Sequence, residues 1–132
     1  MKTVIKGYKY RIYPTEEQKE LINKTFGCSR FVYNHFLAMK IGLYKTEQKS
    51  LSYNKCSSLL TELKKEREWL KEVDKFALQN SLKDLNTAYQ NFFREIQKNN
   101  TNQGFPKFKS KKNNYKSYRT NFTNNNIEVN FE

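Results

Sequence analysis

The strongest constraint on the fold is a helical repeat of apolar residues in the second half of the chain. Large apolar side chains recur there mostly three or four residues apart, at Leu78, Leu82, Leu85, Tyr89, Phe92, Phe93 and Ile96. This spacing is typical of one face of an α-helix, which has about 3.6 residues per turn. Asp74 stands where an N-cap is expected. The sequence therefore predicts that the longest helix runs from Asp74 to about Lys98 and is the spine of a bundle.

Shorter helices are predicted ahead of this one. Thr15 and Gln18 have the spacing of a capping box, which starts a helix. Gly27 is predicted to end that helix, and a second helix then runs to about Tyr44. The pair has the outline of a helix-turn-helix, although two antiparallel helices in any bundle give the same pattern. Ser52 is predicted to cap a third helix.

The two ends of the chain are predicted to be β-structure. Residues 3–13 predict a strand because apolar side chains alternate along them, at Tyr8, Tyr10 and Ile12. Pro14 is expected to end that strand. Residues 117–123 and 127–132, separated by Asn124, Asn125 and Asn126, predict a hairpin.

Charge is unevenly distributed along the chain. Among 132 residues there are 25 Lys and Arg against 13 Asp and Glu, a net charge of +12. No acidic residue precedes Glu16, and none lies between Glu95 and Glu128. An AT-rich genome would also raise the Lys and Asn content, but it would not clear acidic residues from two particular segments. A polyanionic partner is therefore predicted, with nucleic acid as the leading candidate.

Two groups of residues are candidates for that contact. Lys75, Gln79 and Lys83 are spaced by four and share one row near the start of the long helix. Gln can bond adenine and Lys can reach guanine in the major groove, although a plain solvated helix face has the same pattern. Residues 104–119 mix aromatic side chains with six cations. That mixture suits phosphate contacts with base stacking, and a flexible basic linker is the alternative.

Several classes of protein are disfavoured by what the sequence lacks. No stretch approaches the ~20 apolar residues of a membrane span and no signal peptide is present, so a cytoplasmic location is predicted. Cys28 and Cys56 have no metal-binding spacing and His35 is the single histidine, which argues against a zinc cluster or a disulfide framework. His35 is interpreted as a core residue. The two aspartates, Asp74 and Asp84, are expected to serve capping or surface roles, so no catalytic cluster is predicted.

Four segments carry a resemblance to a known family. They are KYRIYPTEEQKELINKTFGCSRFVYNHFLA (9–38), WLKEVDKFALQNSLKDLNTAYQNFF (69–93), GFPKFKSKK (104–112) and SYRTNFTNNNIEV (117–129). In this order they resemble the amino-terminal region of the TnpB/OrfB proteins of bacterial insertion sequences. These are compact RNA-guided DNA nucleases related to type V CRISPR effectors.

The resemblance implies a fold. Residues 1–14 would be the first strand of a wedge domain, 15–98 a helical recognition domain, and 99–132 a basic linker with a returning wedge hairpin. The expected class is α+β, with a four-helix recognition bundle inserted between the strands of an incomplete wedge-type β-barrel. The nuclease domain and zinc ribbon of the family would follow these residues. The chain is therefore expected to have no enzymatic activity of its own and no cofactor, whereas full-length members would use a divalent metal and zinc.

The resemblance also implies partners and site residues. The expected partners are a guide RNA and a double-stranded DNA target, of which the protein reads a short motif beside the target. The positions that match motif reading are Tyr53, Lys75, Gln79, Lys83, Thr123 and Asn124. The expected RNA-binding positions are Lys9, Arg11, Lys107, Lys109 and Lys111. The alternatives are a nuclease-free DNA-binding regulator or relic of the same family, and a basic RNA-binding helical protein.

Overall fold

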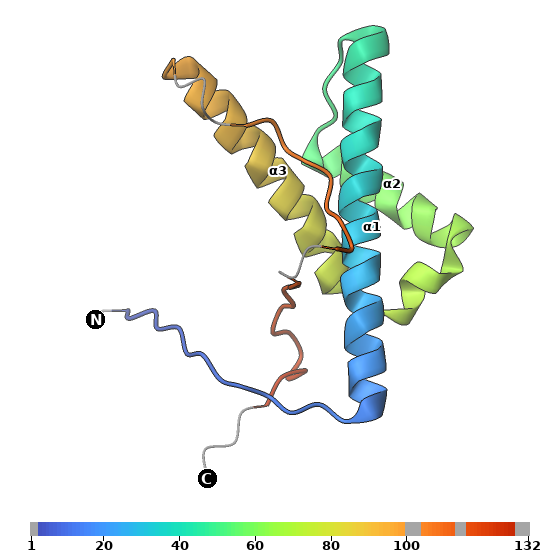
Figure 1. Ribbon diagram of the computed structural model, residues 1–132, viewed down its shortest axis with the longest axis vertical. Coiled ribbons are helices and arrows are strands. Elements are labelled where there is room, and N and C mark those ends of the chain that lie inside the picture. The colour runs from blue at the N-terminus through green and yellow to red at the C-terminus, as the bar shows by residue number, and fades with distance from the viewer. Residues whose placement is uncertain (1–2, 100–103, 113–115, 129–132) are drawn as a thin grey trace.

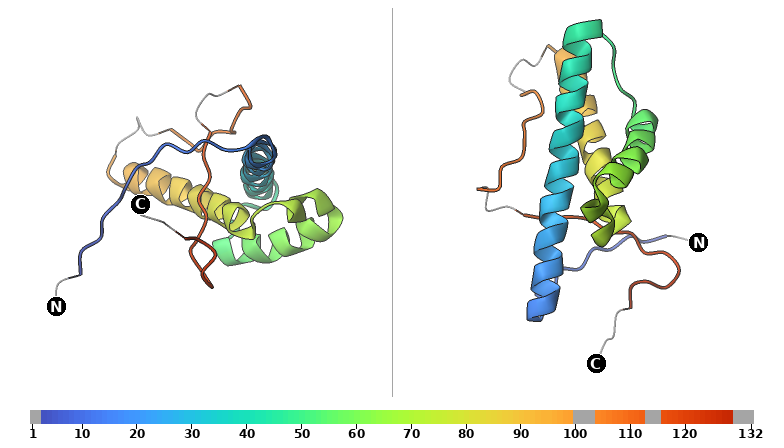
Figure 2. Two further views of the ribbon diagram at one scale, coloured as in Figure 1. Left: turned by 90° about the horizontal axis from the view of Figure 1, so that it is seen from below. Right: turned by 90° about the vertical axis from the view of Figure 1, so that its right-hand side faces the viewer.

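The computed structural model describes residues 3–99, 104–112 and 116–128, and within them the chain is helical. Its elements are α1 (Glu16–Glu47), α2 (Tyr53–Glu66), the 3-10 helix η1 (Glu68–Glu72) and α3 (Lys75–Gln97). Helix α3 begins beside the middle of α1, and the two helices diverge toward their carboxyl ends (Figure 1). Helix α2 and η1 pack against this pair on the side opposite residues 104–112 (Figure 2).

The predicted α+β class is wrong for the part of the chain that the structure describes, because this part contains no strand. Residues 3–13 are extended and fully exposed, and residues 116–128 are irregular. A strand requires a neighbouring strand to satisfy its backbone groups, and alternating polarity alone does not supply one. The first wedge strand, the returning hairpin and the barrel expected here are therefore absent from the described residues; residues 1–2 of the expected first strand and 129–132 of the expected hairpin lie outside them.

The expected break at Gly27 is also wrong. Helix α1 passes through this position and is 32 residues long, so the predicted four-helix bundle has three α-helices and η1. Buried residues on both sides of the glycine, among them Thr25, Cys28 and Val32, continue one face of the same helix. A glycine inside a helix costs about 0.5–1 kcal/mol, which burial of that face outweighs. The helix ends instead at Gln48, which adopts a left-handed conformation with φ 53°.

Three of the predicted helix starts, at Thr15, Ser52 and Asp74, are confirmed, whereas no helix starts directly after Gly27 because α1 is continuous there. The Gln18 N–H donates to Thr15 Oγ1 at 3.3 Å and the Thr15 N–H donates to Gln18 Oε1 at 2.8 Å, which completes the capping box. Ser52 accepts from the Lys55 N–H at 3.2 Å and caps α2. Asp74 accepts from the Phe76 N–H at 3.0 Å and caps α3. Helix α3 has nearly the predicted bounds, although at 23 residues it is shorter than α1.

The core is formed by side chains from every helical element. Its most buried members are Val32, Phe36, Leu37, Cys56, Leu60, Leu70, Leu78, Leu82 and Leu85. The most extensive contact is between α1 and α3. At their crossing the Ser81 hydroxyl donates to the Ser29 carbonyl at 2.7 Å. The apolar stripe of α3 extends beyond this core: near the carboxyl end of the helix, Phe93 is 54% exposed and Ile96 is 47% exposed.

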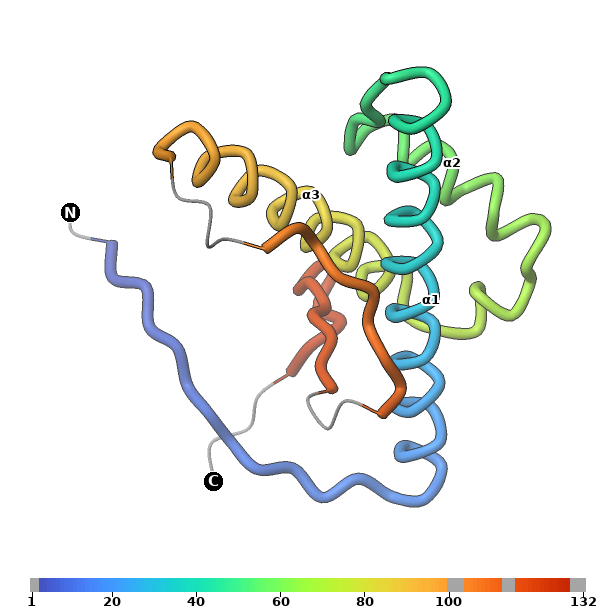
Figure 3. The backbone as a smooth tube through the Cα atoms, turned by 45° about the horizontal axis from the view of Figure 1, so that its top comes forward, coloured from blue at the N-terminus to red at the C-terminus, as the bar shows by residue number. Residues whose placement is uncertain are grey.

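The described parts of the carboxy-terminal segment, residues 104–112 and 116–128, return along the helices (Figure 3). Its first described part, residues 104–112, runs back beside α1 and α3, and its second, residues 116–128, passes the amino-terminal half of α3. The segment therefore brings its cations against the crossing of α1 and α3.

Candidate nucleic-acid interface

The row Lys75, Gln79 and Lys83 lies on the surface of α3. Lys75 and Lys83 are exposed and Gln79 is half-buried. The three share a face because positions four apart stack along a helix. The Lys75 ammonium lies 5.1 Å from the centroid of the Phe76 ring, a cation–π contact. The row is thus open to a ligand, as base reading requires, and its reading of bases stays a prediction.

A further cation lies beside the start of this row. Burial lowers the pKa of Lys64, near the end of α2, and the positive charge of Lys75 lowers that pKa further. The two ammonium groups therefore repel each other across the junction of α2 and α3. An anion placed between them would relieve that repulsion, because an opposite charge stabilises the protonated form of both.

The other predicted motif-reading residues have structural neighbours of their own. Tyr53, the first residue of α2, is half-buried against the core. Thr123 and Asn124 belong to a turn in which the Thr123 N–H donates to Asn126 Oδ1 at 2.7 Å and the Asn126 N–H donates to the Thr123 carbonyl at 3.0 Å. Asn124 and Asn125 have positive φ there. The predicted asparagine turn is therefore present without its strands. In the described ranges no hydrogen bond or ion pair joins Tyr53 or this turn to the α3 row.

Of the predicted RNA-binding residues, Lys109 is held against α1. The Asn34 amide donates to the Lys109 carbonyl at 2.9 Å and accepts from the Lys109 N–H at 2.8 Å. The Lys109 ammonium lies 4.5 Å from the centroid of the Tyr33 ring. Lys107 and Lys111 on either side are exposed. One neutral amide therefore fixes the backbone in the middle of this cationic stretch.

Lys9 and Arg11 lie in the exposed segment ahead of α1. The Arg11 guanidinium is 5.6 Å from the centroid of the Tyr13 ring. The Tyr8 and Tyr10 rings stack with 6.4 Å between their centroids. These are contacts within the segment. Residues 3–13, which carry Lys9 and Arg11, run apart from residues 107–111 (Figure 3), so the structure does not bring the two halves of the predicted RNA site together.

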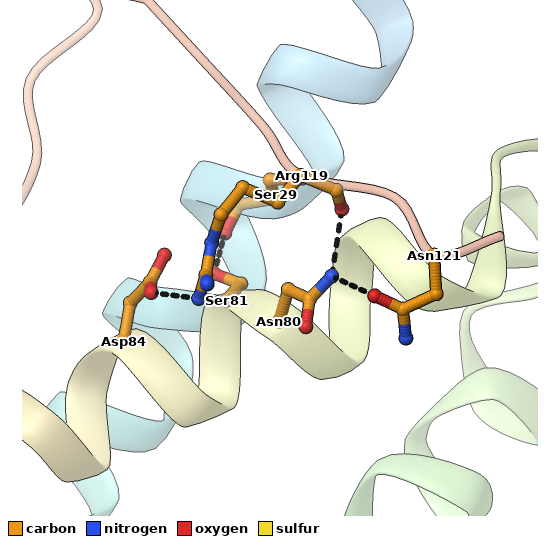
Figure 4. Close-up of polar contacts among 6 residues, drawn as sticks. All are labelled: Ser29, Asn80, Ser81, Asp84, Arg119 and Asn121. Atoms are coloured by element: carbon orange, nitrogen blue, oxygen red, sulfur yellow. Dashed lines mark hydrogen bonds and ion pairs between the residues drawn. The ribbon is translucent and has the colours of Figure 1, made fainter. Parts of the chain in front are cut away.

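A second set of contacts fixes the segment to α3 (Figure 4). Asn80 is only 4% exposed, and its amide donates to the Arg119 carbonyl at 2.9 Å and to Asn121 Oδ1 at 3.2 Å. The Arg119 guanidinium forms an ion pair with Asp84. Asp74, the cap of α3, accepts a hydrogen bond from the Thr120 hydroxyl. Asn80 thus holds the backbone that positions Arg119.

These contacts enclose a cavity of about 140 Å³ between α1, α3 and the carboxy-terminal segment. Its lining contains four cations, Arg30, Lys109, Lys116 and Arg119, and one carboxylate, Asp84. They come from three parts of the chain that are distant in sequence. The cavity therefore concentrates positive charge at the crossing of the helices.

Arg30 was missed by sequence reasoning. The sequence feature that could have identified Arg30 is that it is the one cation between residues 25 and 39, in the middle of a largely apolar helix face. The neighbouring Ser29 also lines the cavity, and its hydroxyl is buried without a hydrogen-bond partner among the described residues. Buried hydroxyls usually have a partner, so the Ser29 hydroxyl, which lies beneath the cavity surface, is an exception.

The side chains considered for metal binding lie apart. Over residues 3–99, 104–112 and 116–128, no group of three or more His, Cys, Asp and Glu is placed to hold a metal ion. Cys28 and Cys56 are buried, and burial raises the pKa of both thiols. His35 is half-buried at the edge of the core; burial lowers its pKa and the charge of Arg67 lowers it further. In the same part of the chain, no helix has the length and apolar character to span a membrane.

Comparisons with known proteins identify the chain's relatives. Residues 1–49 match the helix-turn-helix domain of the IS605-type OrfB proteins, in a region where this structure has the single helix α1. A putative RNA-guided DNA endonuclease of Streptomyces pristinaespiralis is 41% identical over 114 residues, which are 85% of this chain and 27% of that protein. The putative RNA-guided DNA endonuclease InsQ of Escherichia coli K12 is 35% identical over 109 residues, 81% of this chain and 26% of InsQ.

A third relative is matched over nearly its whole length. The virulence protein VsdF of Salmonella dublin is 38% identical over 117 residues, which are 82% of this chain and 95% of VsdF. The chain thus spans about a quarter of the length of the two endonucleases, which it matches over 27% and 26%, and nearly the whole of VsdF. The chain belongs to the TnpB/OrfB family of insertion-sequence-encoded RNA-guided DNA endonucleases.

Proposed function

We propose that this chain is the nucleic-acid-binding amino-terminal part of an RNA-guided DNA endonuclease. In this proposal it holds a guide RNA and reads a short DNA motif beside the target, in the cytoplasm. The proposal assigns no residue of this chain to DNA cleavage, to a divalent metal or to zinc. The observation that carries the proposal is that over four-fifths of the chain, 85% and 81%, aligns with two proteins named as RNA-guided DNA endonucleases.

The geometry of α3 supports motif reading. Lys75, Gln79 and Lys83 form an accessible row at the amino-terminal half of the helix, where the helix dipole favours a nearby phosphate. Lys64 adds positive charge beside it. A helix that presents donors from its first turns to base edges, with cations on its flank, has the arrangement used for readout in the major groove.

The direct test is a binding assay with matched glutamine variants. A preferred motif is first selected from randomised duplexes, and affinity for motif and scrambled duplex is then measured by fluorescence anisotropy. Gln79→Ala is expected to weaken motif binding by about 1–3 kcal/mol and scrambled binding little, because a lost base contact affects only the specific sequence. Gln90→Ala, an exposed glutamine farther along α3, is the control and should change neither.

Two results would overturn the motif-reading proposal. One is an equal loss on both duplexes for Gln79→Ala, which would leave the row a general phosphate contact. The other is affinity that does not fall with salt, because each neutralised duplex phosphate should contribute about 0.9 to the slope of log affinity against log salt.

A second candidate function is favoured by the match to VsdF, which extends over 95% of that protein. A chain of this extent would then act by itself as a nuclease-free DNA-binding regulator. The two candidates differ in their need for RNA. The regulator should bind motif duplex after treatment with ribonuclease, whereas the guide-dependent module should lose motif-specific binding when co-purified RNA is removed.

A further inference from the structure

The cavity between α1, α3 and residues 109–110 and 116–119 carries more positive charge than its own residues neutralise. Four cationic residues and one carboxylate, Asp84, line it, and Asp84 is already paired with Arg119. In the described part of the chain, Arg30, Lys109 and Lys116 form no ion pair. These cations therefore give a cavity of about 140 Å³ a positive potential that favours an anion.

Two neutral amides hold the backbone beside these cations. The Asn34 amide fixes the Lys109 backbone and the Asn80 amide fixes the Arg119 carbonyl. Two carboxylates also anchor the segment, Asp84 through its ion pair with Arg119 and Asp74 through the Thr120 hydroxyl. The amides position the backbone without neutralising Lys109 or Lys116, whose charges stay available to a ligand. The construction is that of a preformed anion site.

Arg30 also borders a second hollow, on a neighbouring face of α1. Gly27, Phe31, Asn34, His35 and Trp69 complete its lining. Phe31 meets Trp69 at 4.9 Å between ring centroids and stacks with His35 at 5.7 Å, and Trp69 is 42% exposed. A side chain at Gly27 would have the Arg30 guanidinium as its nearest neighbour, 3.9 Å from its Cβ. The guanidinium therefore lies between a cationic cavity and an aromatic hollow.

We propose that the cavity binds a backbone phosphate of single-stranded nucleic acid and that the adjacent base stacks in the hollow of Phe31, His35 and Trp69, with Arg30 between them. This inference rests on the proposed nucleic-acid-binding function and names a contact within it that is separate from the α3 row. A cationic site next to exposed rings is the combination that binds single strands, since phosphate and base then contact different surfaces. In a duplex the base is paired and stacked, and it cannot enter the hollow.

The test measures binding of fluorescein-labelled oligouridine and oligothymidine, each about ten nucleotides long, to the whole chain. Arg30→Gln is expected to weaken both by about tenfold or more, and to lower the salt slope by about 0.7, the value for one phosphate of a single strand. Arg94→Gln, an exposed arginine outside the cavity, is the matched control and should leave both unchanged. Arg30→Lys keeps the charge and should fall between wild type and Arg30→Gln.

Two more variants separate a ligand site from a purely structural role. Asp84→Asn removes the carboxylate from the cavity lining and is expected to strengthen binding several-fold. A structural Asp84–Arg119 pair would give weaker binding instead, and that result would overturn the proposal. Trp69→Leu should weaken oligonucleotide binding about fivefold or more through lost stacking, without changing the response to free inorganic phosphate as a competitor.

Other outcomes are equally decisive. If Arg30→Gln behaves like Arg94→Gln while both stay folded by circular dichroism, no phosphate binds in the cavity. A ribose preference would appear as tighter oligouridine than oligothymidine binding, and equal affinities would assign the site to the phosphate and base alone. The two proposals can also fail separately. If Gln79→Ala leaves the duplex preference unchanged while Arg30→Gln still weakens single-strand binding, the proposed motif reading is wrong and the site at Arg30 is supported.

Discussion

The helical unit, residues 16–97, and the carboxy-terminal segment, residues 104–112 and 116–128, are held in place by different forces. The helical unit has a core in which Phe36, Leu37 and Leu78 are completely buried. The segment adds no residue to that core and is attached mainly through side-chain amides, an ion pair and a cap, together with edge-to-face ring contacts of Phe105 and Tyr118 at the helix surface. Burial of apolar area is strong and non-directional, whereas a hydrogen bond contributes only about 1 kcal/mol net.

The residues that stabilise the fold are therefore largely separate from those that carry the charge for binding. The core maintains the helices independently of ligand, so α1 and α3 form a rigid base. The segment carries many of the cations and makes fewer buried contacts than the helices, and such regions open at lower free energy than the core. The comparison predicts two levels of unfolding, which mutations should distinguish.

The largest expected effect is in the core. Leu78→Ala should destabilise the chain by about 2–5 kcal/mol, because it removes a completely buried side chain and leaves a cavity. Leu21→Ala, at a leucine that is 50% exposed on α1, is the matched control and should cost far less. Thermal unfolding followed by circular dichroism at 222 nm, a helix signal, measures both. Equal losses would contradict the assignment of the core to the α1–α3 contact.

The next effect should be confined to the segment. Asn80→Ala removes two hydrogen bonds from a buried amide and should release residues 116–128 at a cost of about 1–3 kcal/mol. Hydrogen exchange of the segment should accelerate while the helical circular dichroism signal stays unchanged. Asn86→Ala, at a half-buried asparagine on the same helix, should do neither. Loss of the helices together with the segment would show that the two regions are one cooperative unit.

A smaller effect tests the continuity of α1. Gly27→Ala should stabilise the chain by about 0.5–1 kcal/mol, because alanine loses less backbone entropy in a helix and its Cβ meets only the Arg30 guanidinium at 3.9 Å. The melting temperature measures the change. A lower melting temperature would mean that Gly27 adopts a turn conformation which alanine cannot follow, as the two-helix interpretation of the sequence required.

The smallest effect concerns the pH dependence of the helical unit. Burial, then the charge of Arg67, lowers the pKa of His35 below its ordinary 6.5, so the unfolded chain binds the proton more strongly than the folded one. Stability is therefore full above the ordinary value and falls as pH drops through it toward the lowered pKa. The melting temperature should decrease from about pH 7.5 to about pH 5.5, and less so in His35→Gln. An identical decrease in both proteins would remove His35 as the cause.

Local structure was predictable where the signal is local. The cap residues Thr15, Ser52 and Asp74 were identified correctly because a cap depends on the hydrogen bonds of one helical turn. The bounds of α3 followed from its apolar period for the same reason. Gly27 was misjudged because a helix breaker acts only when the packing on its two sides does not favour one continuous helix.

Contacts between distant parts of the chain were not predictable in the same way. The alternation in residues 3–13 suggested a strand, but strand formation depends on a partner that no local pattern specifies. The candidate site also has a part that was predictable from local spacing and a part that was not. The row of Lys75, Gln79 and Lys83 follows from helical spacing alone, whereas the meeting of Arg30 with Arg119 requires the fold.

The sequence by itself determined the helix starts, the apolar faces, the excess of cations at the two ends and the family. Periodicity, capping and composition are properties of neighbouring residues, and they can be read without knowing what packs against what. Only the tertiary structure decided that α1 is continuous and that two asparagines hold the carboxy-terminal segment over the α1–α3 crossing. These outcomes depend on burial and on hydrogen bonds between residues 39 to 75 positions apart, which chain spacing does not encode.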